Sequence, residues 1–224
     1  FQLCMVSFIN MIIIVFVQLF MNVEKPVVAK IKVGIVITYA ICTLILIATA
    51  ISKMSLYIES YGLTQKRVYS SWLMIVLALL FVVAVVKQFV KKLNAVAVSC
   101  AVVVVMFAGL ALSNVDGQIA RYNVDRYLEG SLETVDVWAM RDLGDAAVPE
   151  MVRLIDELKA RGVTDESGRY SEEYNLYSRT LGVLEDIVIE YINDDRQMMS
   201  YTIPYLRAKD ALEDRGIKSL FYEW

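Results

Sequence analysis

Four long stretches of this chain contain no charged residue, and they constrain its fold more than any other feature. They cover residues 1–23, 33–52, 68–86 and 93–115. Each reaches or nearly reaches the ~20 residues that an α-helix needs to cross the ~30 Å hydrocarbon core of a bilayer. Core helices of soluble proteins are shorter and are seldom apolar on every face. We therefore predict four transmembrane helices, at about 2–22, 33–53, 68–88 and 94–114.

The charged residues divide the chain into two parts. Residues 1–114 hold nine Lys and Arg against two acids, which gives +7, whereas residues 115–224 hold thirteen against twenty-three, which gives −10. The formal net charge of −3 conceals this division. We predict an all-α protein, with a polytopic transmembrane helix bundle over residues 1–114 and a small, acidic, helical soluble domain over residues 115–224.

The residue types and motifs that usually support catalysis are missing from this sequence. It contains no histidine, which is the commonest general base and metal ligand. It has no glycine-rich phosphate loop, no HExxH and no cysteine pair with zinc spacing. We predict no catalytic, cofactor-binding or metal-binding residue in this chain, and an enzyme is the less favoured reading. The acidic tail also argues against nucleic acid as a partner, because it would repel phosphates.

Small and polar side chains fall on one face of several predicted spans. The first span carries Ser7, Asn10 and Gln18, the second Thr38, Cys42, Thr49 and Ser52, and the fourth Ala97, Ala101 and Ala108. One interpretation is a polar pathway for a solute. The other is helix packing stabilised by interhelical hydrogen bonds and by small residues that let helices approach. Packing is favoured, because proton and ion pathways usually need a charged residue within a span and none is present.

The lysines of the loops predict the orientation in the membrane. The first and third loops, residues 24–32 and 87–92, share one side and carry six lysines. The opposite side carries five basic residues, which are Lys53, Lys66, Arg67, Arg121 and Arg126. The positive-inside rule then places the first and third loops in the cytoplasm and the tail outside it.

Helical periodicity runs through the acidic tail, in which no strand pattern is found. A one-sided apolar stripe predicts a helix that ends at Gly162, with Asp145 as its N-cap and Pro149 in its first turn. The stripe consists of Val148, Met151, Val152, Ile155 and Leu158. Helical patterns also fit residues 116–129 and 203–215, and residues 164–169 are predicted to form a loop.

A longer helix is predicted to begin at Ser171. Its apolar and aromatic residues alternate at spacings of three and four, as in a seam that packs against another helix: Tyr174, Tyr177, Leu181, Leu184, Val188 and Tyr191. Fewer than three heptads are present, so we expect this seam to pack within the tail rather than in a free coiled coil.

Two segments carry recognisable motifs. Residues 54–67 read MSLYIESYGLTQKR, and residues 114–126 read NVDGQIARYNVDR. In the first, Gly62 can end a helix in a left-handed conformation and Thr64 can cap the next helix. The aromatic rings of this segment suit a membrane–water interface, although Lys66 and Arg67 could instead hold an anionic lipid headgroup.

These strings resemble the RMxLYxxxYGLTxxR and NxDxxIAxxNVxR signatures of a bacterial multi-pass membrane family, the domain of unknown function 4173, which is related to number 4153. The similarity covers about residues 1–160, although Lys53 stands where the family pattern often has Arg. Members usually carry further spans upstream, and residue 1 here is Phe rather than Met. We therefore expect an upstream portion. The resemblance implies motif positions at Tyr57, Tyr61, Gly62, Thr64, Arg67, Asp116, Arg121, Asn123 and Arg126.

The two motifs must emerge on one side of the membrane if there are four spans. We therefore hypothesise that Arg67 or Arg126 pairs with Asp116 or Glu59 and locks the tail against the membrane domain. The favoured function is a bacterial inner-membrane component for interaction, assembly or sensing, with the lipid bilayer and a protein partner or a second copy as its partners. The alternatives are a transporter or lipid-handling subunit, and a membrane enzyme whose active site lies outside this chain.

Overall fold

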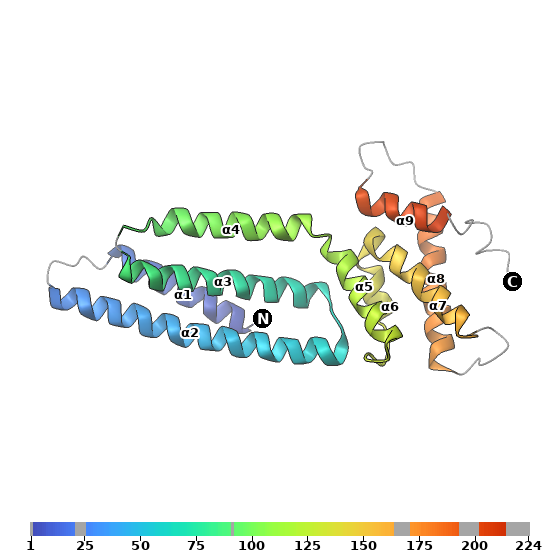
Figure 1. Ribbon diagram of the computed structural model, residues 1–224, viewed down its shortest axis with the longest axis horizontal. Helices are drawn as coiled ribbons and strands as arrows, with labels where there is room; N and C mark the ends of the chain where they lie inside the picture. Colours follow the sequence, from blue (N-terminus) through green and yellow to red (C-terminus); the bar gives the residue numbers. More distant parts are fainter. Residues whose placement is uncertain (1, 21–25, 91, 164–170, 193–201, 214–224) are drawn as a thin grey trace. The chain divides into compact units, whose positions relative to one another are not determined.

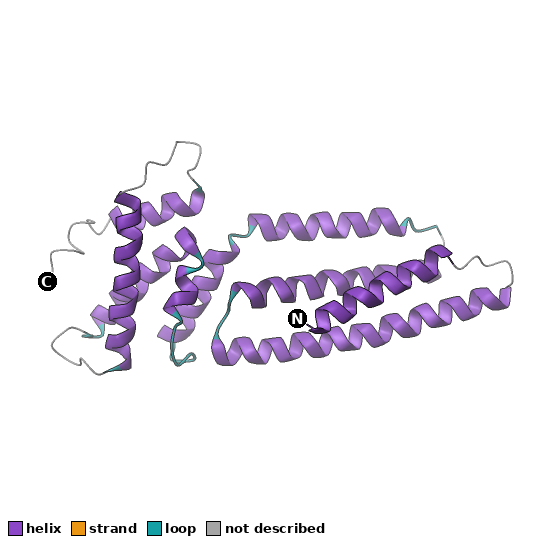
Figure 2. Cartoon of the chain, turned by 180° about the vertical axis from the view of Figure 1, so that it is seen from behind, coloured by secondary structure: helices purple, strands orange, loops and turns teal. Residues whose placement is uncertain are grey.

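The computed structural model describes residues 2–20, 26–90, 92–163, 171–192 and 202–213. All regular structure in these ranges is helical, as Figure 2 shows, and this confirms the all-α prediction. The apolar part contains α1 (Gln2–Phe20), α2 (Pro26–Tyr61), α3 (Gln65–Phe89) and α4 (Ala95–Leu112). The tail contains α5 (Val115–Leu128), α6 (Val137–Arg141), the 3-10 helix η1 (Gly144–Ala147), α7 (Val148–Ala160), α8 (Glu172–Ile192) and α9 (Ile203–Glu213).

The chain forms two compact units that do not follow one another along the sequence. The first unit contains Phe1–Ile58 and Lys66–Ser113. The second contains Asn114–Trp224 together with Glu59–Gln65, which comprises the last three residues of α2, the connection 62–64 and the first residue of α3. This short segment, called loop 59–65 below, is therefore part of the same compact unit as the tail.

Among the described residues, three helices are long and apolar enough to cross a membrane (Figure 1). They are Val27–Tyr61, Gln65–Phe89 and Ala95–Leu112, and a shorter apolar helix covers Met5–Val17. This confirms a transmembrane helix bundle. At 1.5 Å per residue, the 36 residues of α2 span about 54 Å, which is far more than the hydrocarbon core. The helix extends beyond the predicted span at both ends, and it continues to Tyr61 because no glycine or proline occurs between Gly34 and Gly62.

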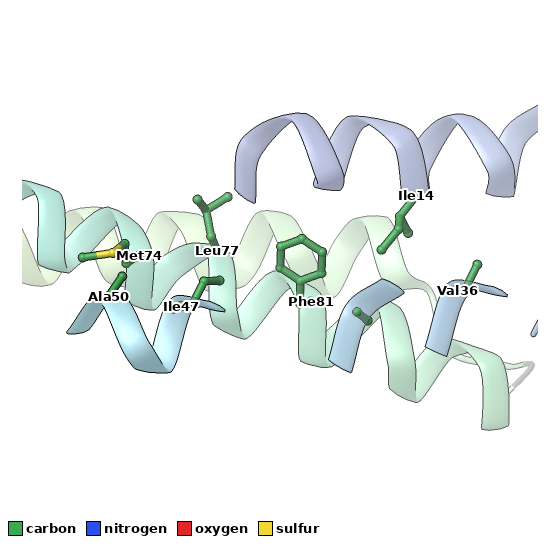
Figure 3. Packing of buried hydrophobic residues seen from close by; sticks show 8 residues of the cluster. Ile14, Val36, Ile47, Ala50, Met74, Leu77 and Phe81 are labelled. Atoms are coloured by element: carbon green, nitrogen blue, oxygen red, sulfur yellow. The ribbon is translucent and has the colours of Figure 1, made fainter. Parts of the chain in front are cut away.

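Helices α1, α2 and α3 share one hydrophobic core. Figure 3 shows Ile14 extending from α1 toward residues of α2 and α3. Phe81 of α3 is completely buried there, and Ala40 and Ala50 of α2 leave room for neighbouring helices. The other members of this core are Val36, Ile47, Met74 and Leu77. Close packing of large and small side chains therefore holds the three helices together.

Buried polar residues of the first two helices take part in packing. Asn10 donates through Nδ2 to Thr43 Oγ1 over 3.1 Å, and Thr43 donates to the Tyr39 carbonyl over 2.8 Å. Ser7 is buried as well, so part of the predicted polar face of α1 does lie inside the unit. This contact supports the packing interpretation of that face.

The predicted polar stripe of the second span lies elsewhere. Thr38, Cys42 and Thr49 are exposed. The buried face of α2 instead contains Thr43 and Ala50, each one position after a residue of the predicted stripe. Thr49 and Ser52 donate to carbonyls of their own helix. The side chain of Gln18, predicted on the polar face of the first span, lies outside the described residues.

Helix α4 buries none of its residues within the described structure. Its predicted small-residue face, at Ala97, Ala101 and Ala108, is exposed. Trp72 of α3 donates through Nε1 to the Met106 carbonyl of α4 over 3.3 Å. This contact joins α4 to the first unit.

The tail packs around α7, which contacts α5, α8, α9 and η1. Its predicted apolar stripe is buried and Gly162 follows its end at φ +82°, so both predictions are confirmed. Asp145 is not the N-cap, because it lies within η1, where its main-chain carbonyl accepts from the Val148 N–H. The N-cap residue of α7 is Ala147, and Pro149 lies in the first turn as predicted.

Helix α8 begins after Ser171, whose hydroxyl accepts from the Tyr174 N–H, and its seam packs within the tail as predicted. Leu181, Leu184 and Val188 of that seam are buried. The side chain of Tyr191 and the predicted loop at residues 164–169 lie outside the described residues. Helix α6 was not predicted from the sequence. The Asp136 carboxylate caps it by accepting from the N–H groups of Trp138 and Ala139.

Replacing Phe81 with Ala should lower the free energy of unfolding of the first unit by about 3 kcal/mol. This value is at the low end for a buried phenylalanine, because the lipid around the helices is as apolar as their core. The matched control is Val82→Ala, because Val82 is 46% exposed. It should change the free energy of unfolding by less than about 0.5 kcal/mol. Unfolding of the intact chain in detergent mixtures, followed by tryptophan fluorescence, measures both. Equal losses would contradict this packing.

Candidate functional site at the junction of loop 59–65 and helix α5

Gly62 ends α2 and begins the junction. Its φ is +74°, in the left-handed region that glycine adopts without steric cost, as the sequence predicted. A Cβ at this position would lie 2.6 Å from Asn123 Oδ1 and 3.4 Å from Leu132 Cδ2. Gly62 is therefore required both for its backbone conformation and for the close approach of the loop to α5.

Asn123 binds the main chain of the loop at Leu63. Its Oδ1 accepts from the Leu63 N–H over 2.7 Å, and its Nδ2 donates to the Leu63 carbonyl over 2.8 Å. The Asn123 side chain lies on the buried face of α5, beside Ile119, Ala120 and Val124 in sequence. A carboxamide offers one acceptor and one donor side by side, so it satisfies both groups of one residue. The loop is held through its backbone.

Arg126 makes a second set of contacts one helical turn further on. Its Nη1 donates to the main-chain carbonyl of Glu59 over 2.8 Å. Its Nε and Nη2 donate to the hydroxyl and the carbonyl of Ser131, at 3.0 and 2.8 Å. The guanidinium also lies 5.7 Å from the centre of the Tyr122 ring. The planar, multidentate guanidinium thus connects the end of α2 to the turn that follows α5, which the single ammonium of a lysine could not do.

Asp116 completes the junction at the start of α5. Its Oδ1 accepts from Gln65 Nε2 over 2.9 Å. Asp116 lies in the first turn of α5, where a carboxylate also interacts favourably with the helix dipole. Asn114, just before the helix, has φ +45°, a conformation that asparagine tolerates better than most residues. This residue forms the turn between α4 and α5.

An ion pair joins α5 to α7. Arg153 of α7 contacts Asp125 of α5 and donates to Glu150 over 2.8 Å. The hydrogen bond that Arg153 donates to Asp125, together with the charges of Glu150 and Asp125, outweighs burial and raises the pKa of Arg153. Arg121 lies 3.6 Å from Asp125 and is largely exposed. The helix that binds the loop is therefore anchored to the core of the tail.

The structure brings several of the predicted motif residues together. Gly62 lies against Asn123, and Asp116 and Arg126 contact the same loop at its two ends. Tyr61, Thr64 and Arg121 belong to the same compact unit, whereas Tyr57 and Arg67 belong to the first unit. Thr64 directly precedes α3, the position predicted for its cap, and Tyr57 and Tyr61 are exposed.

The predicted pairing takes a different form from an ion pair between side chains. Arg126 reaches Glu59 at its main-chain carbonyl, and Asp116 bonds to Gln65. Sequence reasoning missed Gln65, Leu63 and Ser131 as participants. Gln65 and Leu63 lie inside the quoted motif. Leu63 takes part through its main-chain N–H and carbonyl, which every residue except proline has, so its residue type does not indicate this role. Geometrically, the site is a set of hydrogen bonds that fixes a loop.

A family model described as Domain of unknown function (DUF4153) matches residues 1–154. The match covers α1 to α6, η1 and the first part of α7 as far as Leu154. It therefore includes the whole junction. No curated protein and no solved structure matches the sequence significantly.

The contact between Gly62 and Asn123 can be tested by a double-mutant cycle. Gly62→Ala should destabilise the chain more than Gly130→Ala, because Gly130 has φ +75° but nothing within 4 Å of its Cβ position. The control should cost about 1–2 kcal/mol from backbone strain alone. Asn123→Ala should cost about 1–3 kcal/mol, since it leaves the Leu63 peptide groups without a partner.

The double variant Gly62→Ala with Asn123→Ala removes the steric conflict. Its loss should be smaller than the sum of the two single losses by about 0.5–3 kcal/mol. Thermal unfolding of the intact chain in nanodiscs measures all four proteins. Strict additivity would show that the two residues do not meet.

Proposed function

The chain belongs to the DUF4153 family, and from the junction described above we propose that it is a membrane protein whose tail serves as an interaction or sensing module. In this proposal, a partner or signal engages the tail, and loop 59–65 transmits the event to the membrane helices. The transmembrane domain comprises residues 1–114 and the soluble domain residues 115–224, with the loop held by the latter.

The observation that carries this proposal is the way the loop is bound. The Leu63 peptide is held at both of its polar groups by Asn123. The loop continues directly into α2 at one end and into α3 at the other, and these two helices share the core around Phe81. A change in the position of α5 would therefore displace the ends of two packed helices. Stiff helices and discrete hydrogen bonds are the elements through which such coupling acts.

The proposal places the protein in the cytoplasmic membrane of a bacterium, with the tail outside the cytoplasm. The bacterial assignment rests on the resemblance of the two motifs. The orientation rests on the lysines of the first and third loops and the positive-inside rule. The other surface of the membrane would then carry both loop 59–65 and the tail, and their membership of one compact unit supports this shared side.

The orientation can be tested by protease access to the tail. Spheroplasts that contain the intact chain should lose the tail to added protease, while sealed inverted vesicles should protect it. Immunodetection of an epitope after residue 224 reports the cleavage. A tail that is protected in spheroplasts and digested in inverted vesicles would reverse the orientation.

The interaction function can be tested by cross-linking in native membranes. Mass spectrometry should assign the cross-links to neighbouring proteins mainly to the tail, and Asn123→Ala should change the cross-links made by the ends of α2 and α3. The control is Asp210→Ala, because Asp210 is an exposed residue of α9 that makes no contact at the junction. Cross-links confined to the spans, and unchanged by Asn123→Ala, would contradict the proposed role.

A further inference from the structure

The tail contains a groove that the junction does not use. Its volume is about 590 Å³. Residues 133–138 form one wall, and Glu172, Asn175, Leu176 and Arg179 of α8 form the other. Both walls belong to the second compact unit. The groove is large enough for several side chains of a bound peptide.

The floor of the groove is apolar and ends at an exposed tryptophan. Val135, Val137 and Leu176 are each no more than 5% exposed, whereas Trp138 is 61% exposed. The Trp138 ring contacts a charged side chain. Arg141 lies 6.0 Å from the centre of this ring and pairs with Asp186 of α8 over 3.3 Å. An exposed tryptophan ring beside an apolar floor offers an anchor position for a partner protein.

The rim of the groove is acidic. Glu133, Asp136 and Glu172 contribute three carboxylates against the single guanidinium of Arg179. The whole tail sequence carries −10, so the field around the groove has the same sign. Charge of this kind attracts cationic ligands and repels nucleic acids and anionic headgroups.

One wall also offers main-chain groups. Residues 133–135 lie outside the helices, and within the described structure their N–H and C=O groups make no hydrogen bond to other main-chain groups. An extended peptide can pair with such a segment through its own backbone. The groove thus combines main-chain donors and acceptors, an apolar floor and an acidic rim.

We propose that this groove binds an extended, basic segment of a partner protein. Its backbone pairs with residues 133–135, an apolar side chain packs against Trp138 and the floor, and lysine or arginine side chains lie near Glu133 and Glu172. The inference rests on the proposed function insofar as the tail is an interaction module, but it uses none of the contacts at the junction.

The binding test uses the intact chain in nanodiscs of zwitterionic lipid, so that the bilayer does not attract the probe. The probe is a fluorescent peptide in which lysine and leucine alternate, and the comparison peptide replaces lysine with glutamate. Fluorescence anisotropy should show binding of the lysine peptide only. Higher salt should weaken it, because ions screen the exposed carboxylates.

Two variants locate the binding site. Glu133→Lys with Glu172→Lys should weaken binding about tenfold or more, and Trp138→Ala should weaken it at least about fivefold. The matched control, Glu157→Lys with Asp210→Lys, makes the same change of charge at exposed residues of α7 and α9 outside the groove. It should retain most of the affinity. If the double lysine variant at Glu133 and Glu172 fails to fold, the double variant Glu133→Gln with Glu172→Gln is used in its place.

Several outcomes overturn the proposal. These are no binding of the lysine peptide, preference for the glutamate peptide, or equal weakening by the groove and control variants. The Asn123→Ala variant separates this proposal from the junction, since it should bind the peptide normally. Peptide binding at the groove without partner cross-links on the tail would refute the proposed function and leave the groove as a peptide site.

Discussion

The carboxamide of Asn123 is the contact on which the organisation of this protein depends. It satisfies the N–H and the carbonyl of Leu63, a residue sixty positions earlier in the chain. Leaving these two part-buried groups without partners would cost about 1–3 kcal/mol in total. The left-handed turn at Gly62 and the bond from Arg126 to the Glu59 carbonyl both serve to present this stretch of main chain to α5.

Binding through the backbone has a consequence for how the two units are connected. The loop is covalently continuous with two membrane helices, yet Glu59, Leu63 and Gln65 form hydrogen bonds with residues of α5. Helix α5 is in turn fixed to α7 by Arg153 and Asp125, and α7 lies at the centre of the tail. A continuous set of contacts therefore extends from the core of the tail to the ends of α2 and α3.

Much of this fold could be predicted because apolar patterns are local. The four uncharged runs correspond, among the described residues, to three helices long enough to cross a membrane and one shorter apolar helix, and the stripe on α7 predicted its buried face correctly. The glycine of the motif predicted a helix end at Gly62. The length of α2 was underestimated, because charge marks where a helix leaves lipid and not where it ends.

The partners within the junction could not be predicted for a different reason. Asp116 bonds to Gln65 and Asn123 to a peptide group, and neither choice follows from charge or periodicity. In α2, Thr43 is buried, one position after Cys42 of the stripe predicted from the sequence. The buried face of α2 is determined by its packing against α1 and α3. Tertiary packing selects among polar residues that look equivalent in sequence.

Hydrogen exchange at the Leu63 amide tests the central claim most directly. In the intact chain in nanodiscs, this amide should be protected to a degree similar to Val124, which lies in the buried face of α5. Exchange at Leu63 as fast as in an unstructured peptide, with Val124 still protected, would show that Asn123 does not hold the loop.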